Sequence, residues 1–185
     1  MEVKGTAVEA MPKFIGEKFG QDGLNNWIGE LSEECQKIFS KPILSSQWYP
    51  LKEVLVEPTL KCCSLFYQGD TKGALEIGRY SAELGLKGIY KVFVKIGSTE
   101  FLIKKASTIL PTYYNPSAME VVDKDKGTAT IRITQFPEPH EVVDLRIKGW
   151  MEEALTISGA KDVKVNILQS MASGAPTTDF AATWN

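Results

Sequence analysis

The chain has 185 residues, enough to bury roughly 70% of its unfolded surface without help from a metal or a disulfide framework. Hydrophobic residues make up 43% of the sequence and the formal net charge is −2, which excludes an electrostatic argument for nucleic acid or for an anionic membrane surface. The three cysteines, Cys35, Cys62 and Cys63, have the spacing of neither a disulfide framework nor a zinc site, and no metal is expected.

The N-terminal segment carries acidic residues early and has no long apolar run, so we do not interpret it as a signal peptide. No later stretch is long and apolar enough to span a membrane. We therefore expect a cytoplasmic protein.

The first part of the chain has helical periodicity. Gly20 is expected to end a first helix, and residues 24–31 repeat the same spacing in a second. Pro50 is expected to begin a further helix, and Pro58 to kink or break it. One face of the first helix collects four apolar residues: Val8, Met11, Ile15 and Phe19.

A longer helical pattern follows the turn at Gly69, with an apolar and glycine stripe at Leu75, Gly78, Ala82 and Leu86. Gly97 is expected to end it. Ser98 is expected to cap the next helix, which Pro111 interrupts.

The periodicity then changes from helical to alternating. Two strands are expected around Met119–Val121 and Ala129–Ile133, joined by a hairpin turn that ends at Gly127. A helix follows from His140 to Gly159, and two last strands are expected at 163–167 and 180–184. The order is strand–strand–helix–strand–strand.

This pattern predicts an α+β fold, in which an N-terminal helical layer packs on a C-terminal four-stranded antiparallel sheet of ββαββ order. We expect residues 1–185 to form a single domain. Its helical subregion covers 1–115 and its ββαββ subregion covers 116–185.

Several phrases of the sequence resemble a known superfamily. They are WYP at Trp48–Pro50, GRYSAELGLKGIYKVF at Gly78–Phe93, TYY at Thr112–Tyr114, and FPEPHEVVDLRIKGWMEEAL from Phe136. The superfamily contains vinyl-reductase-type small-molecule-binding domains, haem nitric-oxide-binding domains and TRAPP vesicle-tethering subunits. The phrases resemble most a paralogous family of myxobacteria and related deltaproteobacteria. The resemblance implies a pocket between the helices and the sheet, which holds haem, a hydrophobic small molecule or an acyl chain in the relatives.

The resemblance also implies what a haem protein of this superfamily would need. Its haem-binding members carry a proximal histidine in the helix before the first strand, and a Tyr-x-Ser-x-Arg pattern after the first hairpin. The corresponding helix here, STEFLIKKASTILPTYY, has no histidine, and TQFPEPHE has neither serine nor arginine. Tyr113 or Tyr114 stands near enough to ligate iron in principle. We nevertheless expect no cofactor, haem included.

His140 is the only histidine of the chain. With Pro139 as the first helical residue, it falls in the first turn of a helix, where the helix dipole disfavours a protonated imidazole. A general base or a metal ligand is the alternative, but both need a partner group that the sequence does not offer nearby. We interpret His140 as a residue that starts a helix.

Cys62 and Cys63 follow Pro58 on a predicted helix. In the tethering relatives a helix cysteine carries an acyl chain, which makes the pair a candidate for acylation or for a reactive thiol. The alternative is that both are small, buried apolar residues, and we favour it because cysteine is often buried.

An aromatic set with polar tips is the candidate lining of a ligand pocket: Trp48, Tyr49, Tyr80, Tyr113 and Tyr114. The same residues suit a core or a dimer interface. Arg79 is a candidate to bind a carboxylate or phosphate of a ligand. Pairing with Glu76 or Glu83 on its own helix is the alternative that we favour.

No nucleophile elbow, P-loop or dinucleotide fingerprint is present, and we predict a protein that is not an enzyme. The leading hypothesis is a sensory or ligand-binding domain for a hydrophobic small molecule, active as a homodimer with a signalling partner protein. The alternative is a ligand-free dimerising interaction module. A haem-based gas sensor is the third hypothesis.

Overall fold

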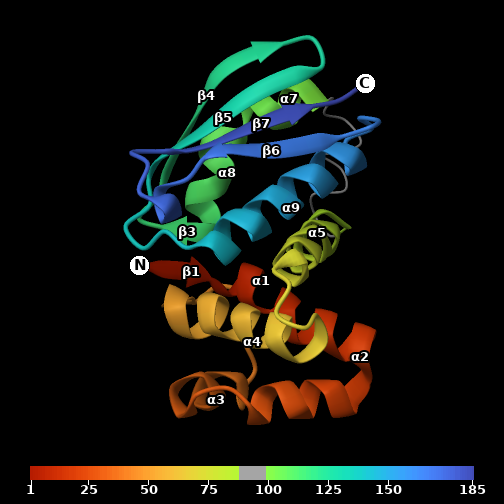
Figure 1. Cartoon of the computed structure of the whole chain (residues 1–185), viewed down its shortest axis with the longest axis vertical. Helices are drawn as coiled ribbons and strands as arrows, with labels where there is room; N and C mark the ends of the chain where they lie inside the picture. The colour runs from red at the N-terminus through yellow and green to blue at the C-terminus, as the bar shows by residue number, and fades with distance from the viewer. Residues whose placement is uncertain (88–98) are drawn as a thin grey trace.

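The computed structural model describes residues 1–87 and 99–185. The predictions about Gly97 and Ser98 therefore lie outside the described residues. Figure 1 shows a sheet at one end of the molecule and a group of helices at the other, with α5 (Lys72–Lys87) and α9 (Glu141–Ile157) between them.

Four antiparallel strands form the large sheet in the order β4-β5-β7-β6. The alternating sequence explains the buried face: Ile131 and Ile133 of β5 are buried, and Phe180 of β7 lies opposite Ile131. Arg132, on the other face, donates to both carboxylate oxygens of Asp179 at 2.8 and 2.7 Å. The strands are β4 (Ala118–Asp125), β5 (Thr128–Gln135), β6 (Lys164–Gln169) and β7 (Thr178–Thr183).

Helix α9 (Glu141–Ile157) packs against β6 and β7 and connects the two hairpins of the sheet. Helices α7 (Thr99–Lys104) and α8 (Ala106–Tyr113) precede β4, and α8 packs on that strand. Pro111 lies inside α8 instead of ending it; a proline has a helical φ and removes one hydrogen bond, which this short helix tolerates. The predicted α+β fold and its four-stranded antiparallel sheet are thus confirmed.

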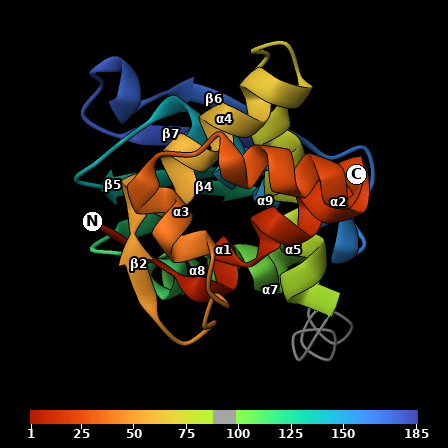
Figure 2. The same cartoon turned by 90° about the horizontal axis from the view of Figure 1, so that it is seen from below.

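The N-terminal helices form the other end of the molecule (Figures 1 and 2). Gly20, at φ +75°, breaks the helical path of α2 where the sequence predicted a helix end. Before Pro58 the chain makes a π-helical turn, η1, which continues into α4, so Pro58 sits in the first turn of α4. The elements are α1 (Gly5–Val8), α2 (Ala10–Gly29), α3 (Glu33–Phe39), η1 (Lys52–Val56) and α4 (Glu57–Phe66).

The structure adds a small sheet that the sequence did not predict, with strand order β2-β1-β3. Pro50 ends β2 in place of beginning a helix, because residues 48–50 pair with the N-terminal strand. Its strands are β1 (Glu2–Lys4), β2 (Trp48–Pro50) and β3 (Tyr114–Asn115). A short 3₁₀ turn, η2 (Met171–Ser173), precedes β7.

Helix α5 (Lys72–Lys87) packs along α9, and two glycines make this close approach possible. A Cβ on Gly78 would lie 2.1 Å from the carbonyl oxygen of Arg146, and a Cβ on Gly149 would lie 2.1 Å from that of Leu75. No larger residue fits at either position unless the helices move apart. The glycine in the predicted stripe of α5 is thus explained by its contact with α9.

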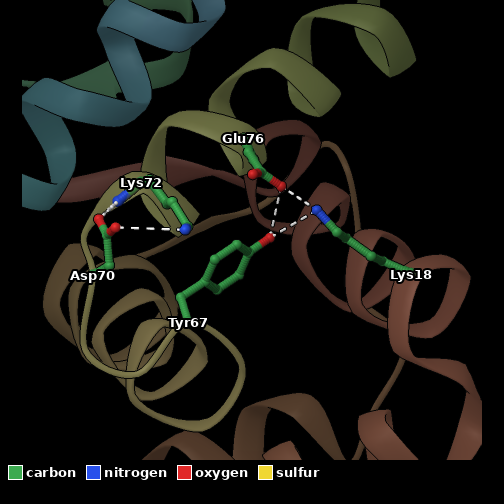
Figure 3. A network of polar contacts seen from close by, with 5 residues as sticks. All are labelled: Lys18, Tyr67, Asp70, Lys72 and Glu76. Atoms are coloured by element: carbon green, nitrogen blue, oxygen red, sulfur yellow. Dashed lines mark hydrogen bonds and ion pairs between the residues drawn. The ribbon is translucent and has the colours of Figure 1, made fainter.

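A polar network joins α2, α4 and α5 on the surface of the helical end (Figure 3). Lys18 donates to the hydroxyl of Tyr67 at 3.0 Å and pairs with Glu76, and Tyr67 donates to the same carboxylate at 2.7 Å. Burial opposes ionisation of Glu76, but the hydrogen bonds from Lys18 and Tyr67 outweigh it and lower the pKa. The network fixes three helices relative to one another.

Among residues 1–87 and 99–185, no helix has both the length and the apolar character that a membrane crossing requires.

Candidate functional site

A cavity of about 350 Å³ lies between the helices and the large sheet. Helices α5, α7, α8 and α9 and strands β4 and β5 contribute to its walls, and α1 contributes at one side. The volume is within the range of small-molecule pockets, roughly 300–1,000 Å³. Most of its walls are aliphatic, among them Leu102, Ala106, Leu110, Ile131, Ile147 and Met151.

Small side chains explain why the space is hollow. Ala106 begins α8, Ala154 lies on the buried face of α9, and Gly85 has no side chain on α5. A Cβ on Gly85 would meet nothing closer than the hydroxyl of Tyr113, at 3.9 Å. Larger residues such as Trp150 and Leu155 line the cavity beside these small residues, which leave volume between the helices.

Two of the predicted site residues line the cavity: Tyr113, which ends α8, and Tyr114, which begins β3. The Tyr113 ring lies 6.2 Å from that of Trp150, and the Tyr114 ring 5.4 Å from that of Phe136. Burial raises the pKa of Tyr114, so its hydroxyl keeps its proton near neutral pH. Both tyrosines therefore bring hydrogen-bonding groups to an apolar wall.

The other predicted aromatic residues lie away from the cavity lining. Trp48 and Tyr49 are in β2, where Lys4 stacks over the Trp48 ring and the Tyr49 hydroxyl accepts from the Leu44 amide at 2.9 Å. Tyr80 packs edge-on against Phe14, with ring centroids 5.5 Å apart. These three residues stay predicted ligand contacts, and the structure gives each a packing role.

Arg79 lies on α5 and pairs with Glu152 of α9, with nitrogen–oxygen distances of 2.6 and 3.2 Å. The sequence favoured a pair with Glu76 or Glu83 on its own helix. The pair with Glu152 is a contact that the sequence did not indicate, and the close packing of α5 and α9 brings the two side chains within reach. Arg79 is not part of the cavity lining.

Sequence reasoning missed Arg146, which lies on the buried face of α9 and lines the cavity. Its side chain is 4% exposed. Its guanidinium donates to the Thr59 hydroxyl at 3.1 Å and to the Ala7 carbonyl at 3.4 Å, and approaches the Met11 sulfur at 3.7 Å. A signal was available: Arg146 shares a helix face with Val142, Val143 and Trp150, which is an unusual place for a charge.

Asp144 is a second buried ionisable group on α9, and Ser170 donates a hydrogen bond to it from the segment before η2. Burial raises the pKa of Asp144 to about 6, against the opposing effect of the Ser170 hydrogen bond. The pair ties α9 to the loop that leads into β7.

Cys62 and Cys63 are both buried on α4. Burial raises the pKa of Cys62 to about 12 and also raises that of Cys63. A raised pKa keeps a thiol protonated and weakly nucleophilic. The reactive thiol remains a sequence prediction, and the packing of both side chains matches the alternative of small apolar residues.

His140 is the N-cap of α9, where its Nδ1 accepts from the Val142 amide at 3.3 Å. The sequence placed it one position later, in the first turn. The helix-starting interpretation holds, and the imidazole satisfies an amide that the helix leaves free. No group of three or more histidine, cysteine, aspartate or glutamate side chains within the described ranges is arranged to hold a metal ion.

No protein-family model matches the chain, and no curated protein matches it. Solved structures do match in fold. An H-NOX protein from S. oneidensis in the Fe(II)NO ligation state has a TM-score of 0.75 at 12% identity, covering 98% of this chain and 99% of that chain.

Two further structures agree with the first. The unliganded Fe(II) H-NOX protein from K. algicida has a TM-score of 0.71 at 10% identity, covering 98% of this chain and 96% of that chain. A mutant of the H-NOX protein from T. tengcongensis has a TM-score of 0.68 at 11% identity, covering 98% of this chain and 97% of that chain. The chain thus has the fold of the H-NOX structures, one of the folds that the resemblance in the sequence implied.

These neighbours correct one prediction. The sequence led us to expect no cofactor and to set haem aside, because the histidine and the Tyr-x-Ser-x-Arg pattern are missing. The proteins that share the fold over nearly its whole length are haem-binding H-NOX proteins, and they make haem a possible cofactor. The expectation rested on local motifs alone and took no account of the fold.

The cavity lining contains residues that can ligate iron, among them Tyr113 and Tyr114 through a hydroxyl and Met151 through a sulfur. The apolar walls are compatible with the face of a porphyrin, and Arg146 supplies a cation for an acidic substituent. The donor set of the lining differs from a histidine-ligated site but is compatible with tyrosine or methionine ligation.

Proposed function

We propose that this chain is a sensory domain, not an enzyme, whose cavity between helices and sheet binds a small molecule with a mostly apolar body. The observation that carries the proposal is the cavity of about 350 Å³ with aliphatic walls and a few polar groups. The H-NOX fold supports it, because structural neighbours hold NO or CO on an Fe(II) centre. We further propose that residues 1–185 act as one domain, that the chain functions as a homodimer, and that a partner protein reads the ligand-bound state.

Native mass spectrometry of the protein as purified tests the proposal, beside a denaturing spectrum. We expect added non-covalent mass, one ligand per chain, and a mass for the intact complex that corresponds to a dimer. Mass that survives denaturation would instead assign a covalent modification, with Cys62 and Cys63 as the first candidates. A ligand-free dimer that also binds no apolar probe would support the interaction module and would contradict the proposal.

A cavity-filling variant links any ligand to this cavity. Ala106→Phe adds an aromatic ring to the cavity wall, while Ala181→Phe makes the same change on a partly buried residue of β7 outside the lining. We expect Ala106→Phe to lose the ligand and Ala181→Phe to keep it. Equal binding by both variants would place the ligand elsewhere.

Hemin titration decides whether haem is the molecule that the cavity holds. Bound haem would supply an iron centre that binds diatomic gases, with Tyr113 or Met151 as the protein ligands. A Soret band that saturates at one hemin per chain, and that Ala106→Phe abolishes, would assign haem to the cavity. Tyr113→Phe would then shift the band if the phenol ligates iron. No saturable band would leave an iron-free apolar molecule as the ligand.

A further inference from the structure

Arg146 has no counter-ion. Its side chain is 4% exposed, yet no ion pair links it to a carboxylate within the described parts of the chain. Its three contacts are a hydroxyl, a carbonyl and a thioether, all of them neutral. A guanidinium keeps its charge in proteins, and buried charges are normally paired because an isolated one is costly. A formal positive charge is therefore buried without compensation.

The cavity is the place from which a negative charge can reach the Arg146 guanidinium. Arg146 is one of its lining residues, and so is Ala7, whose carbonyl the guanidinium contacts. Glu9 is the carboxylate of the lining, but it pairs with Lys13 at 3.1 Å. Nothing else on the described walls carries a negative charge, so a ligand can supply the missing anion.

Tyr114 adds a second donor near the same place. It lines the cavity, and the charge of Arg146 is close enough to oppose the rise in its pKa caused by burial. A protonated phenol and a guanidinium together provide hydrogen-bond donors for one oxyanion. The remaining walls are aliphatic, so these donors would fix the orientation of an otherwise apolar molecule.

We infer that Arg146 is the anchor for an acidic ligand: the cavity selects a molecule with an apolar body and one carboxylate, sulfonate or phosphate group that pairs with this guanidinium. The inference rests on the proposed function and deepens it by naming the ligand class. An anion in a site of low dielectric gains more from a charge-assisted hydrogen bond than it would at the surface.

Two matched fluorescent probes test the inference. The probe 1-anilinonaphthalene-8-sulfonate carries an anion that stays ionised at every useful pH, and N-phenyl-1-naphthylamine has the same rings without it. Because a hydrogen bond to a charged group contributes about 1.5–3 kcal/mol, we expect the sulfonate to bind at least about tenfold more tightly than the neutral probe. Both should bind with one probe per chain and be excluded by Ala106→Phe.

The variant Arg146→Gln should reduce the ratio of the two affinities to near one, while the neutral probe still binds. Binding of the neutral probe is also the control for folding, because it needs the same cavity. Arg146→Lys keeps a charge but not the planar donor set, and we expect an intermediate ratio. Lys148→Gln removes one positive charge from the same helix outside the cavity lining, and should leave the ratio unchanged.

The outcomes separate the two proposals. Equal binding of both probes to the unaltered protein would overturn the role of Arg146 and leave the proposed function standing. A preference for the sulfonate that persists in Arg146→Gln would overturn it as well, because the anion would then bind elsewhere. If Ala106→Phe displaces neither probe, the cavity is not their site and both proposals fail. Displacement of the sulfonate by one equivalent of hemin would identify a porphyrin acid, rather than a free small acid, as a competent ligand.

Discussion

The two ends of the molecule fill their interiors with different side chains. At the helical end, Trp27 is fully buried against Phe39, with ring centroids 5.0 Å apart, and Phe19 stacks on Phe66 at 4.1 Å. Beneath the sheet, the space between α5, α8 and α9 is bounded mostly by aliphatic side chains and by Ala106, with Tyr113, Tyr114 and Trp150 also in its walls. About 350 Å³ of it is hollow.

Tyr113, Tyr114 and Trp150 bring aromatic rings to the cavity as well, so aromatic content alone does not distinguish the cavity from the solid core. Large rigid rings fill volume and fix the helices that carry them, so they concentrate where the protein needs a solid core. A cavity instead needs small side chains at positions that larger ones would otherwise fill. The helical end therefore acts as support, and the sheet end holds the candidate site.

The largest expected loss of stability comes from a substitution at the helical end. Trp27→Ala removes a buried ring and the hydrogen bond from its Nε1 to the Pro58 carbonyl, 3.0 Å long. We expect the free energy of unfolding to fall by about 3–5 kcal/mol in chemical denaturation. Trp150→Ala changes the same residue type at a partly buried position in the cavity lining and should cost less. Equal losses would contradict the distinction between a solid and a hollow core.

The next largest loss of stability is expected where α5 packs on α9, beside the cavity. Gly78→Ala places a Cβ 2.1 Å from the backbone carbonyl oxygen of Arg146, which only a separation of α5 and α9 can relieve. We expect a loss of about 3 kcal/mol, at the upper end of overpacking costs, together with weaker probe binding. Gly29→Ala, with nothing within 4 Å, should cost nothing and serves as the control. Unchanged stability in Gly78→Ala would show that the two helices can move apart freely.

The sequence predicted the helices and strands around the cavity better than it predicted the residues that line the cavity. Alternation at Ala129, Ile131 and Ile133 identified a half-buried strand because the period of two is a direct consequence of the pleat. The N-terminal sheet was missed since its three strands are only two or three residues long, too short to show a period.

For the site, the whole aromatic set was chosen by residue type, and Tyr113 and Tyr114 are the members that line the cavity. Trp48 and Tyr80 were chosen for their residue type, and type does not reveal which of two cores a ring enters. Arg146 was missed because a charge in a helix is usually interpreted as exposed, although its position relative to Val142 and Trp150 placed it on the buried face. Cavities also leave little trace in a sequence, because alanine and glycine are common everywhere.

Asp144 makes the stability of the sheet end depend on pH. Its pKa is raised by burial to about 6, above the value near 3.9 of an unfolded chain. The folded protein then holds a proton that the unfolded chain has released, so stability falls as pH rises from about 4 to about 6. We expect Asp144→Asn to remove this dependence on pH. The difference in unfolding free energy between the unaltered protein and the variant should change by about 2 kcal/mol from about pH 4 to about pH 7.

Denaturation series at pH 4 and pH 7 measure that difference. The carboxylates with lowered pKa, Glu57, Glu76 and Asp179, lose their contributions at lower pH, below their ordinary titration range, and so do not produce the same slope. A difference that is constant from pH 4 to pH 7 would show that Asp144 titrates normally in the folded protein.

The smallest expected effect distinguishes Arg79 of α5 from Arg146 of α9. Arg79→Gln breaks a pair with Glu152 in which the arginine is 46% exposed, and solvent screens such pairs. We expect a loss of less than about 1 kcal/mol, shrinking further at high salt, and an unchanged affinity for both naphthalene probes. If Arg79→Gln weakened the sulfonate probe as strongly as Arg146→Gln does, the anion would bind near the surface of α5. The buried guanidinium would then be a structural link between α1, α4 and α9 rather than the anchor of the cavity.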